Sequence, residues 1–254
     1  MKKHSKLTFL ITTSKTKFAI IAACVLAASQ VANAAFTISG SVGGAPTGVH
    51  KVNFDDLFTG DNTQTATSPN GTVGISFITD GQVVQGSSQG QYAAPWLSGG
   101  NGNGFGPLGG NQVDGADATT YLTSGGAGGE AILSFGASEK YLGLLWGSVD
   151  PFNTLTFYSG GTGGTVVGTV TGSQAIASPN GNQGVNGTVY VNISSDTAFD
   201  TVVATSSEHA FEFDNVAYNE TSVVPEPTTL LAGAMLLLPF GVSALRIVRR
   251  NRKA

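Results

Sequence analysis

The sequence predicts an all-β domain, built as a two-sheet antiparallel β-sandwich of jelly-roll type. Between residues 35 and 219, short runs alternate apolar and small polar residues, as half-buried strands do. Gly, Asn and Pro separate these runs and are typical of turns. No stretch of this region repeats its apolar residues with the period of an amphipathic helix. These 185 residues are enough for one domain with its own hydrophobic core.

The alternating runs place the expected strands along the whole domain. They cover residues 36–42, 49–54, 72–79, 131–135, 141–146, 154–158, 165–170, 188–193, 198–205 and 210–218. The tetrapeptide Ser68-Pro69-Asn70-Gly71 precedes the third of these strands and recurs at residues 178–181. Asn-Gly predicts a tight turn at both places, because these residues adopt positive φ at little cost.

Residues 86–129 differ from the rest of the domain, since fourteen of these 44 positions are glycine. We expect long loops here with one or two short strands, and a loop of this length is either functional or mobile. Tyr92 and Trp96 lie within this segment, among Gly, Ser and Asn residues. Their rings are candidate platforms for the sugar rings of a polysaccharide. The alternative is that Trp96 folds back onto the core.

The basic residues are concentrated at the two ends of the chain. Between residues 35 and 225 there are two lysines, Lys51 and Lys140, and fifteen acidic residues, so this part carries a net charge of about −13. Nucleic acids and anionic lipids bind through clustered Lys and Arg side chains. A nucleic-acid partner is therefore excluded, whereas the carboxylates are able to attract divalent cations.

Two aspartates of the glycine-rich segment, Asp114 and Asp117, are candidate calcium ligands, because calcium takes oxygen ligands from loops. The alternative is that both are solvated residues of an acidic loop. No metal site built from histidine is predicted, since His50 and His209 are far apart in the sequence. Apart from calcium, no cofactor is expected.

The motifs that suggest catalysis lack the structural context that each requires. Residues 86–90 match the G-x-S-x-G nucleophile pattern, but that pattern needs a strand-to-helix turn in an α/β sheet. Residues 104–109 match G-x-G-x-x-G without the following helix of a dinucleotide site. Glu212 and Asp214 share one face of a strand, and we expect that face to be exposed if the neighbouring phenylalanines point into the core. A glycosidase requires two carboxyls that face one cleft, and an exposed strand face does not provide one. Because none of the motifs has the context that it requires, the sequence favours a non-enzymatic protein.

Residues 1–34 have the pattern of a secretory signal peptide, with a lysine-rich start, an apolar run and a small-residue cleavage site. Ala32 and Ala34 fit the cleavage rule, so we expect the mature chain to begin at Ala35. Cleavage there removes Cys24, the one cysteine of the sequence. The mature protein is then expected to have neither disulfides nor thiolate metal sites.

Residues 220–254 combine three unlike elements in a fixed order. The motif Pro225-Glu226-Pro227 comes first, and an apolar run at residues 230–245 follows, which predicts a transmembrane helix. The tail after it contains Arg246, Arg249, Arg250, Arg252 and Lys253. Basic residues beside a spanning helix remain on the cytoplasmic side of the membrane.

This order of elements resembles the PEP-CTERM sorting signal of exported bacterial proteins. The resemblance implies export by the general secretion machinery, transient anchoring in the inner membrane, and processing by an exosortase at or near Pro225-Glu226-Pro227. It also implies a host that makes exopolysaccharide. The resulting prediction is a non-enzymatic exported protein of the cell surface or extracellular matrix. The alternatives are a carbohydrate-binding module for exopolysaccharide and a carbohydrate-active enzyme.

Overall fold

The computed structural model describes residues 34–41 and 43–223. Residues 1–33 of the predicted signal peptide lie outside the described residues, and so do the sorting motif at 225–227, the apolar run and the basic tail. Within the described residues, no helix is long and apolar enough to cross a membrane.

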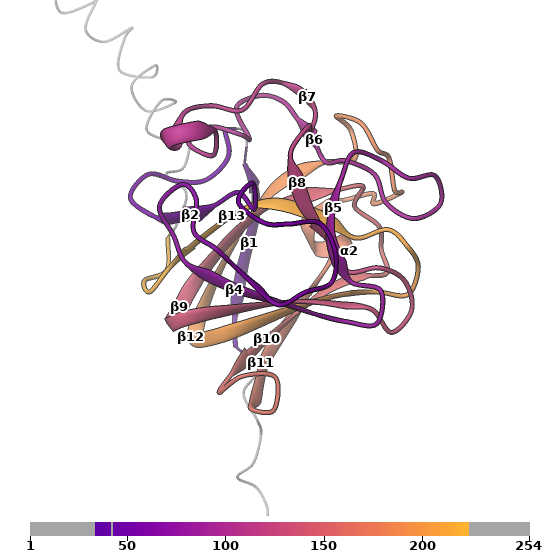
Figure 1. The fold of residues 1–254 in the computed structure, drawn as a ribbon. Helices are drawn as coiled ribbons and strands as arrows, with labels where there is room; N and C mark the ends of the chain where they lie inside the picture. The colour runs from indigo at the N-terminus through magenta and orange to yellow at the C-terminus, as the bar shows by residue number, and fades with distance from the viewer. Residues whose placement is uncertain (1–33, 42, 224–254) are drawn as a thin grey trace, which may run out of the picture. The chain divides into compact units, whose positions relative to one another are not determined.

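The described chain is all-β, as the alternation predicts, and its strands are short apart from β9 and β12 (Figure 1). The strands are β1 (Phe36–Ser41), β2 (His50–Val52), β3 (Gln64–Ala66), β4 (Val73–Ile78), β5 (Gln82–Gln85), β6 (Trp96–Leu97), β7 (Gly115–Ala116), β8 (Thr120–Thr123), β9 (Glu130–Gly147), β10 (Asn153–Ser159), β11 (Thr165–Thr171), β12 (Val189–Ser206) and β13 (Glu212–Asn219). A 3₁₀ turn, η1 (Pro107–Gly109), and a four-residue helix, α2 (Gly172–Ala175), complete the elements of the described residues.

Eleven of these strands form one large sheet, and β6 and β7 form a separate two-stranded sheet. The two 18-residue strands β9 and β12 pair along their length and form the centre of the large sheet (Figure 1). Their register shifts at Phe199, opposite Glu139, and this irregularity divides the sheet into two halves. In one half β4 and β10 flank the central pair, and in the other half β13 and β1 flank it.

Alternation located the principal strands but missed their continuity. The runs predicted at 131–135 and 141–146 belong to the single strand β9, and those at 188–193 and 198–205 belong to β12. Small polar residues around the irregularity interrupt the pattern while the backbone stays extended. The sequence also missed β3 and β5, and the glycine-rich region holds three short strands where one or two were expected. The all-β class is confirmed, while the jelly-roll arrangement stays a prediction.

One hydrophobic core joins the two halves of the large sheet. Phe135 of one half contacts Tyr218 of the other with ring centroids 5.1 Å apart, and it also meets Phe199 edge-on at 6.0 Å. Trp146 is fully buried and stacks on Phe211 with centroids 4.5 Å apart. Because aromatic contacts cross between the halves, the sheet is folded around this core.

The opposite face of the sheet is also buried, which alternation did not predict. Every residue of β13 except Asn219 is buried, and so is every residue from Tyr141 to Gly147 in β9. Residues 93–117, here named the covering segment, supply the second layer. Their side chains Leu97 and Phe105 form a cluster with Tyr141, Leu145, Tyr190 and other residues on the outer side of the sheet.

Close packing, and not positive φ, accounts for the glycine of the first turn tetrapeptide. Gly71 lies outside the positive-φ region, contrary to the expected turn conformation. A Cβ atom there would lie 2.9 Å from the carbonyl oxygen of Lys51 and 3.0 Å from the hydroxyl of Tyr218. Any larger residue at this position would displace the backbone of β2.

Glu139 gives the fold a pH dependence that can be measured. Its side chain is 2% exposed and its Oε2 has no hydrogen-bond partner. Burial, with a smaller contribution from Glu220, raises its pKa from 4.5 to about 7, and His50 opposes the rise. The folded chain therefore holds this proton more tightly than the unfolded chain does. The contribution of Glu139 to stability is fully present below pH 4.5 and is lost as the pH rises from 4.5 to 7.

We expect Glu139→Gln to remove this loss, so that the variant is about 2 kcal/mol more stable than the wild type at pH 8 and comparable at pH 4. Urea unfolding across this pH range measures the difference. Glu130→Gln, at the partly exposed start of the same strand, is the control. Equal pH slopes for the wild type and Glu139→Gln would contradict the assignment.

Candidate functional site

Two carboxyl groups on the outer face of β13 are the most unusual polar residues of the fold. Glu212 lies opposite Gly147, and Asp214 lies opposite Leu145, which belongs to the outer cluster. The prediction that they share a face is therefore correct. The prediction that this face is exposed is wrong, because Glu212 is 1% and Asp214 0% exposed. The covering segment, which has no periodic pattern of its own, lies over them.

Glu212 is held by two donors. Its Oε1 accepts a hydrogen bond of 3.2 Å from the backbone N–H of Ala93, and its Oε2 accepts a short one from the hydroxyl of Ser148. Burial raises the pKa of Glu212 from 4.5 to about 7, although both hydrogen bonds oppose the rise. At neutral pH this carboxyl is therefore close to the midpoint of its titration.

Glu212 forms part of the lining of a polar pocket of about 150 Å³. The other polar side chains of the lining belong to Ser88, Gln91, Tyr92, Ser148, Asp150, Gln183 and His209. Burial also raises the pKa of Asp150. Hydroxyls, amides and carboxyls around one aromatic ring suit a ligand that carries many hydroxyl groups. The volume of the pocket suits a single ring of such a ligand.

The structure separates the two aromatic residues predicted to bind sugars. Tyr92 lines the polar pocket, where it is half-buried and meets Tyr121 edge-on at 6.5 Å. Trp96 lies in β6, outside the lining, and its backbone N–H donates to Thr188 Oγ1. Its side chain is partly exposed, so it neither joins Tyr92 nor enters the core.

The serine and histidine residues of the pocket are not paired with one another. Ser88 donates to Gln91 Oε1 at 3.2 Å, and its backbone forms a bridge with Tyr92 instead of a strand-to-helix turn. Nε2 of His209 lies 3.5 Å from Asp80, which is the one ion pair among the described residues. The hydrogen bonds of a Ser-His-Asp triad are thus not formed here.

A second pocket, of about 340 Å³, lies where the covering segment ends. Both calcium candidates line it, but Asp114 is exposed and Asp117 is 3% exposed. Oδ1 of Asp117 accepts hydrogen bonds from the N–H and the hydroxyl of Thr119 at 2.9 and 2.6 Å. Asp55 also lines this pocket, and burial raises its pKa from 3.8 to about 6. In the part of the chain that the structure describes, no three His, Cys, Asp or Glu side chains are grouped to hold a metal ion.

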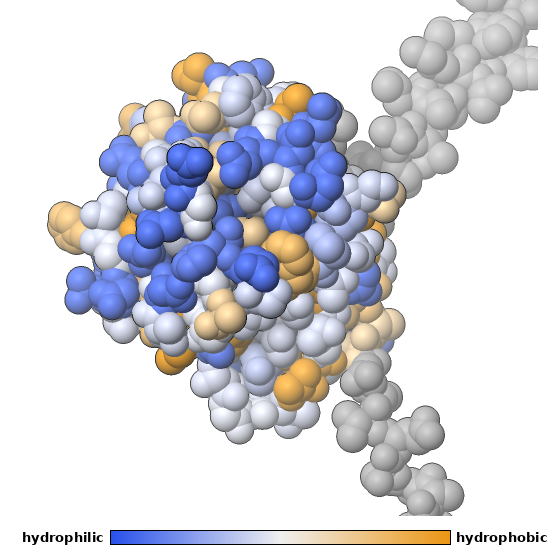
Figure 2. All heavy atoms as spheres, turned by 90° about the vertical axis from the view of Figure 1, so that its right-hand side faces the viewer, coloured by the Kyte–Doolittle hydropathy of each residue, from blue (hydrophilic) through white to orange (hydrophobic). Residues whose placement is uncertain are grey.

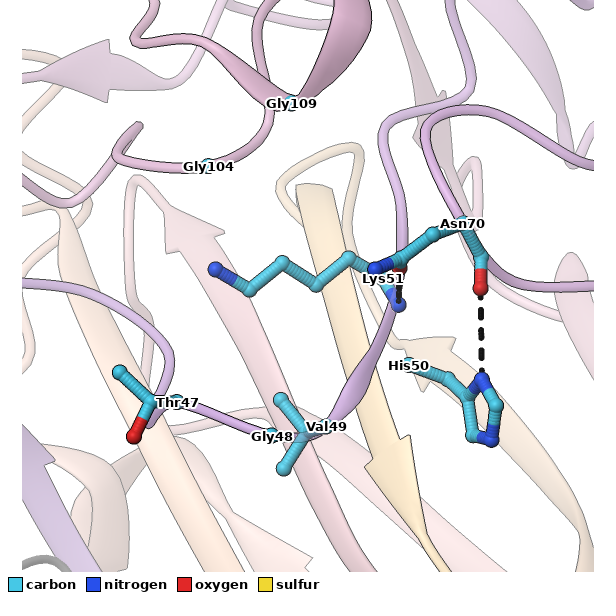
Figure 3. Close-up of a pocket in the computed structure, with 8 residues that line it drawn as sticks. All are labelled: Thr47, Gly48, Val49, His50, Lys51, Asn70, Gly104 and Gly109. Atoms are coloured by element: carbon cyan, nitrogen blue, oxygen red, sulfur yellow. Dashed lines mark hydrogen bonds between the residues drawn. The ribbon is translucent and has the colours of Figure 1, made fainter.

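A third, wider pocket of about 530 Å³ contains Lys51 (Figure 3). The side chain of Lys51 extends towards Gly104, whereas His50 points away from it. Nζ of Lys51 lies 4.9 Å from the ring centre of Phe105 and donates to the carbonyl oxygen of Asn103 at 3.2 Å. Burial lowers the pKa of this lysine. Through these two contacts, Lys51 of β2 holds the covering segment against the sheet.

The comparisons with known proteins do not assign a function to these pockets. The chain matches no protein-family model, no curated protein and no solved structure. The residues of each pocket come from distant parts of the chain. The sequence therefore indicated Tyr92 and Asp117 as site residues and did not indicate Ser148 and Asp150. The i, i+2 spacing of Glu212 and Asp214 was the one local signal of the buried site.

The covering segment is expected to depend on Phe105, which is fully buried and lies 6.1 Å from the ring of Tyr190. Phe105→Ala should cost about 3–5 kcal/mol, because it leaves a cavity between the two layers. We also expect faster amide hydrogen exchange across residues 93–117 than elsewhere in the domain. Hydrogen-exchange mass spectrometry measures this effect. Leu108→Ala is the matched control, since Leu108 lies in the same segment and is fully exposed; equal exchange in the two variants would refute the role of Phe105.

Proposed function

We propose that this chain is an exported, non-enzymatic protein of the cell surface or extracellular matrix, sorted through a C-terminal signal of the PEP-CTERM type. The observation that carries the proposal is the order of the last elements: Pro225-Glu226-Pro227, the apolar run 230–245 and the basic tail. Exosortase and the general secretion machinery are its partners, and the inner membrane holds it transiently. A jelly-roll-like sandwich is the delivered domain.

The contacts of the first and last described residues of the β domain support processing at both ends of the chain. The N–H of Ala35 donates to Asp196 Oδ1 at 3.1 Å, so cleavage before Ala35 would place the new amino group beside a carboxylate. At the C-terminal end of the domain, the hydroxyl of Ser194 donates to the carbonyl oxygen of Val223 at 2.7 Å. Both ends of the domain are therefore hydrogen-bonded to neighbouring residues of β12. Cleavage outside residues 35–223 leaves these hydrogen bonds intact.

Intact-mass measurement of the protein from the medium and surface of the native host tests the sorting proposal. We expect a chain that begins near Ala35 and ends near Pro225-Glu226-Pro227. Glu226→Gln should leave most of the chain in the membrane with its mass extending to Ala254, because the motif is changed. Glu220→Gln, a matched change just before the motif, should behave like the wild type. A wild-type mass that extends to Ala254 would contradict sorting.

A second function, binding of a sugar residue of exopolysaccharide, is favoured by the polar pocket around Tyr92 and Glu212. Tyr92 offers a ring face, and the surrounding hydroxyl, amide and carboxyl groups offer both donors and acceptors. Ala93 and Ser148 hold Glu212, which suits an acceptor for sugar hydroxyls. With a net charge of about −13 on residues 35–225, the domain favours a neutral polysaccharide over an anionic one.

Tyr92→Ala should weaken binding of the purified host exopolysaccharide about tenfold, because it removes stacking area worth about 1.4 kcal/mol. Isothermal titration calorimetry measures the affinity. Tyr158→Ala is the matched control, since Tyr158 of β10 is equally half-buried but lies outside the pocket. Equal weakening by both variants would exclude the pocket. Release of reducing ends by the wild type, lost in Glu212→Gln, would show an enzyme instead.

A further inference from the structure

Asp214 is the most anomalous polar residue of the fold. Its side chain is fully buried, and neither carboxyl oxygen accepts a hydrogen bond with proper geometry. The backbone N–H of Asn215 faces the carboxyl and offsets a small part of the rise in its pKa, which burial and Asp117 cause. A buried polar group without a partner costs free energy, and a buried unpaired charge costs far more. Such a carboxyl is either protonated or balanced by a cation.

After burial, the largest cause of the raised pKa of Asp214 is another carboxyl, that of Asp117. Oδ1 of Asp117 is satisfied by Thr119, but its Oδ2 is buried and unpartnered. Asp55, in the lining of the same pocket as Asp117, adds a further negative charge. Two carboxyls within hydrogen-bonding reach either share a proton or bind a common cation.

Around Asp117 and Asp214, unpartnered hydrogen-bond acceptors outnumber unpartnered donors. Oδ1 of Asn215, on the bulge beside Asp214, is buried and unpartnered, while its Nδ2 donates to Oε1 of Gln112. Four oxygens of Asp117, Asp214 and Asn215 are buried and unpartnered, whereas Gln112, which binds Asn215, contributes a single unpartnered donor, its Nε2. No Lys, Arg or His side chain forms an ion pair with these aspartates in the described part of the chain. This excess of oxygens is the ligand set that a hard cation prefers.

We propose that Asp117 and Asp214, with the amide oxygen of Asn215, bind a divalent cation of the calcium type. The site differs from the sequence prediction, because buried Asp214 takes the place of exposed Asp114. Two carboxylates leave several positions for water, which suits calcium, with its six to eight oxygen ligands. Asp117 lines the second pocket together with Asp114, and Gln112, the hydrogen-bond partner of Asn215, lines it too. The proposal does not depend on carbohydrate binding.

Bound calcium joins the covering segment to the sheet, since Asp117 ends that segment and Asp214 belongs to β13. The test uses the purified full chain, treated with EGTA, dialysed and titrated with calcium chloride. Calorimetry should give one site per chain, and the melting temperature should rise with calcium. Magnesium chloride should bind about tenfold more weakly, because the smaller ion requires a near-ideal octahedron.

Asp214→Asn and Asp117→Asn should each weaken calcium binding about tenfold or more while the far-ultraviolet circular dichroism stays native. Asp114→Asn is the matched control and should bind like the wild type. Two results would overturn the proposal: equal weakening by Asp114→Asn, or a melting temperature that calcium does not change. In the second case, higher stability of both buried variants would identify a shared proton. If Asp214→Asn fails to fold, Asp117→Asn decides alone.

Discussion

Burial of the outer face of β13 and β9 beneath the covering segment is the contact on which the rest of the structure depends. Leu97 and Phe105 cover Tyr141 and Tyr190, which the sheet would otherwise expose to water. The same layer removes Glu212 and Asp214 from solvent, and desolvation is the largest cause of the raised pKa of each. The raised pKa values of both carboxyls thus arise from the packing of the covering segment on the sheet. The remaining surface in view is largely polar, with hydrophobic side chains scattered over it (Figure 2).

Glycine makes this close layering possible. A Cβ atom on Gly147 of β9 would lie 3.1 Å from Cα of Pro95, which is where the covering segment crosses the strand. A Cβ atom on Gly106 would lie 2.7 Å from the carbonyl oxygen of Asn111, within the covering segment itself. The glycine content of residues 86–129 therefore reflects tight packing as well as turns, which composition alone does not distinguish.

The sequence pattern predicted the positions of the strands and the directions of their side chains. It did not predict which face of the sheet another segment covers. Period-two alternation located the main strands and placed Glu212 and Asp214 on one face, because side-chain direction in a strand follows from spacing. It gave the wrong exposure, because alternation does not reveal what packs against a face. Asp117 and Asp214 meet through the topology of the sheet, and no local signal joins them. The predictions on the sorting signal lie outside the described residues and stay predictions.

The two carboxyls of β13 hold opposite ends of the covering segment. Glu212 accepts a hydrogen bond from Ala93 at its start, and Asp214 meets Asp117 at its end. The ends also bind each other, since Asp117 donates its N–H to Pro95 and β6 pairs with β7. Both carboxyls therefore contact the same closed loop. Because Tyr92 directly precedes Ala93, the polar pocket adjoins one end of this closed segment and the aspartates adjoin the other.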